Sequence, residues 1–110
     1  MNRFLKLASD IIQGKPAKLR SPEWEGVEKK HLLEEPKCQW CGGTTDLQVH
    51  HMQPFHLHPE LELDDSNLIT LCEDSATDCH LRNGHLGNWK SFNPDIRVQC
   101  NLRKLQGEIQ

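Results

Sequence analysis

The feature that most constrains this chain is a Cys38-x-x-Cys41 pair followed by two more cysteines, Cys72 and Cys79. The chain has only 110 residues, and 35% of them are hydrophobic, so its apolar core is too small to stabilise it generously. Four sulfur ligands can hold one tetrahedral zinc ion, and a structural zinc ion contributes directly to folding. We therefore expect one small domain stabilised by zinc.

Two points about this zinc site stay open at the level of sequence. A disulfide framework would need an oxidising compartment, whereas Lys6 and Asp10 interrupt the apolar core that an N-terminal secretory signal requires. We therefore favour metal binding over disulfides, and we expect the fifth cysteine, Cys100, to be a small apolar residue away from the others. The fourth ligand is less certain, because His80 directly follows Cys79 and could replace it.

Periodicity and turn residues predict an α+β arrangement. Alternating side chains predict strands over residues 47–52 and 68–72, separated by a long loop. Helices are predicted over residues 2–13, from Ser21 to about Glu34, within 79–91, and after the cap at Asn93-Pro94-Asp95. No apolar run approaches the roughly 20 residues of a membrane span. The last helix is expected to carry an apolar face made of Val98, Leu102, Leu105 and Ile109.

The charges are distributed unevenly along the chain. The formal net charge is -3. Residues 1–20 carry five basic side chains and one acidic one, whereas residues 34–79 carry one lysine and ten acidic side chains. Basic ends around an acidic middle would allow the ends to contact phosphates.

A second group of candidate functional residues is rich in histidine. His50 and His51 are neighbours on a predicted strand and so point to opposite faces, which lets one bind a metal ion while the other faces a substrate. A neutral imidazole with a pKa near ~6.5 is a suitable general base for water. His80 and His85 could complete a divalent-cation site, and the Asn67 amide could fix a loop or the base imidazole.

Four motifs in a fixed order over about residues 37–90 resemble the HNH endonucleases, which belong to the His-Me finger, or ββα-metal, nucleases. The resemblance is to the subgroup with a zinc knuckle. It implies a ββα-metal core, consisting of a two-stranded antiparallel hairpin and a helix, with flanking helices at both ends. The motifs are Cys38-x-x-Cys41, Val49-His50-His51-Met52-x-Pro54, Asn67-Leu68-x-x-Leu71-Cys72 and Cys79-His80.

The resemblance implies a role for each motif residue. It assigns the catalytic divalent ion to His50 and His80, the general base to His51, and the orientation of that base and its loop to Asn67. The family usually spaces its last two cysteines as Cys-x-x-Cys, whereas six residues separate Cys72 from Cys79 here. A loop insertion would preserve the zinc ligands but leaves open whether His80, His85 or both bind the catalytic ion. The structural zinc ligands it implies are Cys38, Cys41, Cys72 and Cys79.

The implied activity is metal-dependent hydrolysis of DNA phosphodiester bonds, with little sequence specificity in isolation. The cation would be Mg²⁺, Mn²⁺ or Ni²⁺, and imidazole ligands favour the softer ions. We expect a cytoplasmic protein without a membrane contact, to which a protein partner or a homodimer could add specificity. DNA would be contacted through its backbone phosphates, and the candidates are Lys18, Arg20, Arg82 and Lys90, with Arg3, Lys15, Arg97, Arg103 and Lys104.

Two other functions are weighed against the nuclease. One is a non-catalytic, zinc-stapled module that binds nucleic acid or protein, and the other is a metal-dependent hydrolase with a different substrate. The set formed by His50, His51 and Asn67 favours the nuclease, because a zinc-binding module has no need of it. Residues 1–36, 37–92 and 93–110 are expected to form N-terminal helices, nuclease core and C-terminal helix of one compact domain.

The remaining histidines and tryptophans are expected to be structural. Trp24 and His31 lie on the apolar stripe of the second predicted helix. His56 and His58 are expected to be exposed loop residues. Trp40 is expected to shield the zinc site, and Trp89 to pack a helix against the hairpin.

Overall fold

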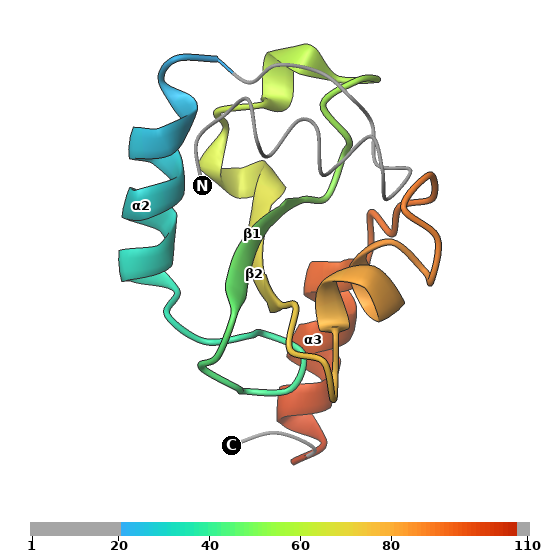
Figure 1. The fold of residues 1–110 in the computed structure, drawn as a ribbon. Coiled ribbons are helices and arrows are strands. Elements are labelled where there is room, and N and C mark those ends of the chain that lie inside the picture. Colours follow the sequence, from blue (N-terminus) through green and yellow to red (C-terminus); the bar gives the residue numbers. More distant parts are fainter. Residues whose placement is uncertain (1–20, 108–110) are drawn as a thin grey trace.

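The computed structural model describes residues 21–107. The elements are α2 (Trp24–Glu34), β1 (Leu47–His51), β2 (Leu68–Cys72), the π-helical turn η3 (His80–Gly84) and α3 (Ile96–Leu105), with short 3-10 turns η1 (Pro59–Leu61) and η2 (Asp65–Asn67). Helix α2 lies along one side of the hairpin, and η3 and α3 lie on the other (Figure 1). The predicted helix over residues 2–13 lies outside the described residues, as do Lys18 and Arg20. The α+β fold class is confirmed, whereas the proposed three-part division stays a prediction.

The two strands pair in antiparallel fashion, with Leu47 opposite Cys72 at one end and His51 opposite Leu68 at the other. Their alternating side chains divide the core into two halves. On the side of α2, Val49 and Leu68 pack with Trp24. On the opposite side, the buried cluster joins the hairpin to the start of α3 and to the cysteines. Its members are Cys38, Met52, Ile69, Leu71, Cys72, Cys79, Ile96 and Cys100.

The outer edge of β2 is closed by residues from three other segments. Every residue of β2 is buried, so its backbone groups on the side away from β1 need partners. The Thr70 N–H donates to Glu35 Oε1 (2.9 Å), and the Thr70 carbonyl accepts from the Gln39 N–H (3.0 Å). The Leu68 carbonyl accepts from the Arg97 guanidinium (2.9 Å). These contacts let a two-stranded sheet lie in the interior of the domain.

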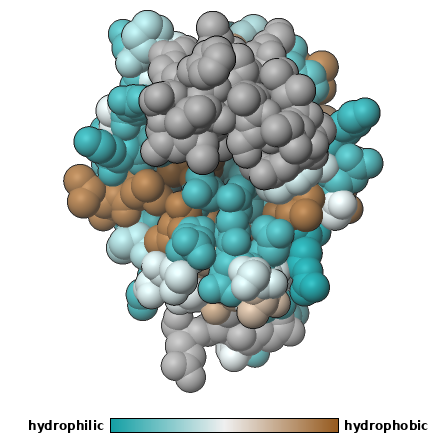
Figure 2. Space-filling view, viewed as in Figure 1, coloured by the Kyte–Doolittle hydropathy of each residue, from teal (hydrophilic) through white to brown (hydrophobic). Residues whose placement is uncertain are grey.

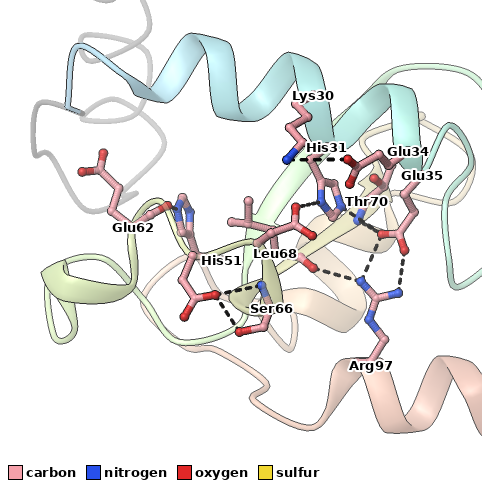
Figure 3. Close-up of polar contacts among 12 residues, drawn as sticks. Lys30, His31, Glu34, Glu35, His51, Glu62, Ser66, Leu68, Thr70 and Arg97 are labelled. Carbon is pink, nitrogen blue, oxygen red and sulfur yellow. Dashed lines mark hydrogen bonds and ion pairs between the residues drawn. The ribbon is translucent and has the colours of Figure 1, made fainter.

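Glu35, just after α2, is the centre of this polar network (Figure 3). Its carboxylate accepts from Arg97 at 2.6 and 3.2 Å and from His31 Nε2 at 3.0 Å. Burial by itself would raise the Glu35 pKa, but the hydrogen bonds from His31, Arg97 and the Thr70 N–H outweigh burial and lower it from 4.5 to about 2. Glu35 therefore joins α2, β2 and α3 through an ionised side chain.

Two expectations change because of this network. Arg97, a candidate DNA contact from the sequence, has its guanidinium engaged within the fold by Glu35 and by the Leu68 carbonyl. His31 is buried as expected, but it also bridges two carboxylates, since its Nδ1 lies 2.9 Å from Asp65 Oδ1. Its hydrogen bond with Glu35, opposed by burial and helped by Asp65, raises the His31 pKa above 6.5.

The helical predictions near the C-terminus are only partly correct. The helical stretch predicted within 79–91 is confirmed as the short π-helical turn η3, which is followed by Leu86 (φ 55°) and Gly87 (φ 83°) in the left-handed conformation. Helix α3 forms, but its buried residues are Ile96 and Cys100. The apolar face predicted for it is exposed where it is described, at Val98, Leu102 and Leu105.

The surface in the view of Figure 2 is mostly hydrophilic, with separate hydrophobic patches. Among the described residues, no helix is both long enough and apolar enough to cross a membrane.

Replacing Glu35 should destabilise the fold. Its lowered pKa means that its ionised form stabilises the protein fully above pH 4.5 and that this stabilisation is lost as the pH falls toward 2. We expect Glu35→Gln to lower the free energy of unfolding at pH 7 by on the order of 3 kcal/mol. Urea denaturation of the zinc-saturated protein measures this change.

Glu34→Gln is the matched control. Glu34 pairs with Lys30 at 3.8 Å on the surface, where both side chains are exposed, so its loss should cost less than about 1 kcal/mol. Equal effects of the two substitutions would contradict the central role of Glu35.

Candidate metal centres and active site

Four cysteine sulfurs converge at one end of the hairpin. The ligand atoms of this group all lie within 4.8 Å of one another, and all of these cysteines are free thiols, not disulfides. The Cys41 and Cys72 sulfurs are 3.8 Å apart, which matches the separation of about 3.8 Å for two thiolates on a tetrahedral zinc ion with Zn–S bonds of ~2.3 Å. The group therefore fits zinc. Its members are Cys38, Cys41, Cys72 and Cys79.

Two turns bring these sulfurs together. In the first, the Cys38 N–H donates to the Gly43 carbonyl (2.8 Å) and the Gly42 N–H donates back to the Cys38 carbonyl (2.8 Å), with Gly42 at a φ of 78°. The expected role of glycine in this turn therefore holds for Gly42. In the second, the Asp74 carbonyl accepts from the N–H groups of Thr77 and Asp78, so the chain after Cys72 doubles back. The longer spacing between the last two cysteines is thus absorbed by a compact turn.

The hydrogen bonds inside the sulfur group favour thiolate at one position. A bond from the Cys79 thiol, followed by bonds from the N–H groups of Cys41, Cys72 and Trp40, outweighs burial and lowers the Cys38 pKa to about 4. Thiolate is the form that binds zinc. The alternative of His80 as the fourth zinc ligand is not favoured by the geometry, because the Cys79 sulfur belongs to this group and His80 belongs to another.

Cys100 lies closer to the zinc ligands than we expected. It is fully buried in the same core cluster as Cys38, Cys72 and Cys79, but it is not among the four converging sulfurs. Burial, with a smaller contribution from Cys38, raises the Cys100 pKa to about 11, so it remains a neutral thiol. Trp40 packs against this cluster from outside, with the Arg103 guanidinium 4.4 Å from its ring centroid.

A second group of potential metal ligands consists of His50, His80 and His85. One nitrogen from each lies within 4.8 Å of the others, and the ring centroids are 4.8 to 5.0 Å apart. His50 comes from β1, whereas the other two lie at either end of η3. Because both helical histidines converge with His50, the two ligand alternatives merge into one three-histidine group.

The π-helical turn explains how His80 and His85 share one side. In an α-helix, residues five apart point about 140° away from each other, since each residue turns the helix by about 100°. Here the His85 N–H donates to the His80 carbonyl (3.0 Å), which is an i to i+5 bond and brings both imidazoles to the same side. Gly84 is also required, because a Cβ there would lie 2.9 Å from Leu71 Cδ1 and 3.2 Å from His50 Nε2.

Oxygen atoms outside the group fix the two helical histidines. His80 Nδ1 donates to Glu73 Oε1 (2.8 Å), and His85 Nδ1 donates to the Ser91 carbonyl (2.8 Å). In the neutral imidazoles, the lone pair of His80 and of His85 is therefore on Nε2. Three imidazole ligands suit Ni²⁺, Mn²⁺ or Zn²⁺ better than an ion that prefers oxygen.

Trp89 contacts this histidine group directly. Its ring centroid lies 4.8 Å from that of His85 and 5.2 Å from that of His80. Trp89 therefore packs on histidines of the group, which sequence reasoning missed when it assigned Trp89 to general packing. Glu73 and Ser91 were missed as well, and their neighbours in the sequence carry no spacing signal that would identify them.

His51 lies on the other face of β1. Its ring stacks on Trp24 with centroids 4.6 Å apart, so Trp24 is a core residue as expected but also contacts a candidate catalytic group. His51 Nε2 lies 2.8 Å from the Glu62 carbonyl, which can only accept, so the proton is on Nε2 and the lone pair is on Nδ1. That is the tautomer opposite to His80 and His85.

Asn67 holds the chain around His51 through hydrogen bonds to the backbone of neighbouring segments. Asn67 Oδ1 accepts from the Gln53 N–H (2.8 Å), and Nδ2 donates to the Gln53 carbonyl (3.0 Å) and more weakly to that of Leu61 (3.4 Å). Leu61 immediately precedes Glu62, whose carbonyl orients His51. Asn67 thus fixes both segments between which the imidazole lies.

The remaining candidates divide by exposure. Arg82, Lys90 and Lys104 are all exposed, and Lys104 also donates a hydrogen bond to the Gln39 side chain. His58 is 43% exposed and pairs with Glu60 (3.2 Å), which fits the expected loop role, whereas His56 is only partly exposed.

Removal of one sulfur ligand should abolish zinc binding. We expect Cys79→Ser to lose the zinc ion. Most of the cooperative unfolding transition should be lost with it, because the free energy of binding a structural zinc ion contributes directly to the free energy of folding. Cys100→Ala is the matched control, since it removes a buried sulfur of the same cluster and should retain one zinc ion per chain. Zinc content by atomic emission and thermal unfolding by circular dichroism measure both effects. Loss of zinc in Cys100→Ala would contradict the assignment.

Comparison with known proteins identifies one family. A family model described as HNH endonuclease matches residues 38–86. No curated protein and no solved structure gives a significant match. The matched segment begins at the first zinc-site cysteine and contains all four of them, both strands and the three converging histidines. Residues 38–86 of this chain therefore match the HNH endonuclease family model, and they include four cysteines positioned to bind a metal ion.

Proposed function

We propose that the protein is a divalent-metal-dependent endonuclease that hydrolyses DNA phosphodiester bonds. The observation that carries this proposal is that two neighbouring histidines of β1 lie in two different environments. His50 converges with His80 and His85, whereas His51 is bonded through Nε2 to the Glu62 carbonyl. A zinc-binding module needs neither arrangement.

His51 is the general base of the proposed reaction. Its Nδ1 lone pair accepts a proton from a water molecule, and that water attacks the phosphorus in line with the leaving oxygen. The Glu62 carbonyl keeps the ring in the required tautomer and also stabilises the protonated imidazole. Asn67 maintains this geometry by fixing residues Gln53 and Leu61.

His50, His80 and His85 would hold the divalent ion through one nitrogen each. The ion, when bound, neutralises charge on the phosphate and on the leaving oxygen. Since β1 ends at His51, a phosphate at the end of this strand could be reached from both of its faces. Arg82 and Lys90 are exposed, lie within or just after the turn that carries the helical histidines, and are suited to contact phosphates of the DNA backbone.

The binding partner and the cellular location of the protein are part of the same proposal. DNA is the expected partner and is contacted through its phosphates, with little sequence specificity. A protein partner or a second copy of this chain could add sequence specificity. A cytoplasmic location also stays a prediction. The rival function is a non-catalytic binding module, which the four-sulfur group alone would support.

Replacement of the proposed base should abolish nicking. We expect His51→Asn to lower the rate of supercoiled-plasmid nicking by at least about 100-fold while the protein stays folded and zinc-loaded. The assay uses Mg²⁺, Mn²⁺ or Ni²⁺ with an EDTA blank, and His58→Asn, the same change in the loop, should leave the rate unchanged. Unaltered nicking by His51→Asn would overturn the assignment of the base. Absence of nicking by the wild-type protein with every ion would favour the binding module.

A methyl group at position 84 should disturb the histidine group. Because a Cβ there meets Leu71 and His50, we expect Gly84→Ala to weaken Ni²⁺ binding and nicking by roughly tenfold or more. Gly26→Ala is the matched control, since nothing lies within 4 Å of its added Cβ and helix propensity should stabilise α2 by up to about 1 kcal/mol. Calorimetric Ni²⁺ titration distinguishes them, and equal affinities would contradict the role of Gly84.

A further inference from the structure

We propose that Glu73 is a positioning residue that sets the affinity of the histidine group for its divalent ion, acting through His80. This inference rests on the proposed metal-binding role of His50, His80 and His85. It adds a carboxylate that lies outside that group and outside the zinc site, although it directly follows the zinc-site residue Cys72.

The contact is a charge-assisted hydrogen bond in a partly buried setting. Glu73 Oε1 lies 2.8 Å from His80 Nδ1, and the two side chains are 29% and 13% exposed. The Glu73 backbone is itself fixed, because its N–H donates to the Asp46 carbonyl (2.8 Å). A fixed carboxylate on Nδ1 holds the ring orientation, keeps the lone pair on Nε2 and makes that nitrogen a stronger donor to a metal ion.

Glu73 is an orienting group and not a fourth ligand. The converging ligand atoms come from the three histidines, and no Glu73 oxygen joins them within the 4.8 Å that defines the group. His85 receives its orientation from a neutral carbonyl, that of Ser91. Glu73 therefore places a negative charge directly against one proposed ligand, His80.

The test uses the full-length, tag-free, zinc-loaded protein and Ni²⁺ titrated by calorimetry. Glu73→Gln keeps the size of the side chain and should weaken Ni²⁺ binding by about 10- to 100-fold. In a His80→Ala background, Glu73→Gln should have no further effect, because the residue acts through His80. Long-range ¹⁵N NMR of the Ni²⁺-free protein should show His80 protonated on Nδ1 in the wild type and a loss of this preference in Glu73→Gln.

Asp46→Asn is the matched control, because it removes one negative charge from an exposed neighbour of Glu73 that makes its contact through the backbone. It should leave Ni²⁺ affinity unchanged. An equal loss in Asp46→Asn, or a persisting loss in the His80→Ala background, would show a general charge effect and overturn the proposal. Unaltered Ni²⁺ affinity in Glu73→Gln would overturn the role of Glu73 but not the proposed metal site. Failure of the wild type to bind Ni²⁺ would overturn the metal site and the role of Glu73 together.

Discussion

The antiparallel pairing of β1 with β2 is the contact on which both groups of potential metal ligands depend. It sets Cys72 at one end of the hairpin and His51 at the other. An isolated two-stranded hairpin is marginal in water, and here every residue of β2 is buried. The pair persists because α2 covers one face, the cluster around Ile96 and Cys100 covers the other, and side chains close the open edge. Zinc at the cysteine end would add a further constraint where the strands separate.

Closing that edge also determines which charges remain for a partner. Glu35 engages Arg97 and His31, and Arg103 lies over Trp40, so these cations serve the fold. A count of basic residues in the sequence therefore overestimates the number that can contact phosphates. Arg82 and Lys90 differ because both are exposed and lie within or just after the turn that carries the helical histidines.

The parts of the structure that could be predicted from the sequence are those set by local spacing. Both strands and the four converging cysteines follow from alternation, glycines and ligand chemistry. The π-helical turn does not, because helical periodicity cannot distinguish an i to i+5 bond from an i to i+4 bond over a single turn. The Glu35–Arg97 contact joins residues 62 positions apart, and nothing local marks either as its partner. The contacts of Trp89 with His80 and His85 likewise arise only once residues 86–91 fold back.

The protonation of the histidines is the strongest argument that the fold serves chemistry as well as stability. His51 is held through Nε2 by a backbone carbonyl, whereas His80 and His85 are held through Nδ1 by a carboxylate and a carbonyl. Each of these three rings has one nitrogen beside an acceptor oxygen, so the lone pair of the neutral imidazole is on the other nitrogen. Neighbouring residues of one strand face two different environments, so this short strand could supply both the base and one metal ligand of the proposed reaction.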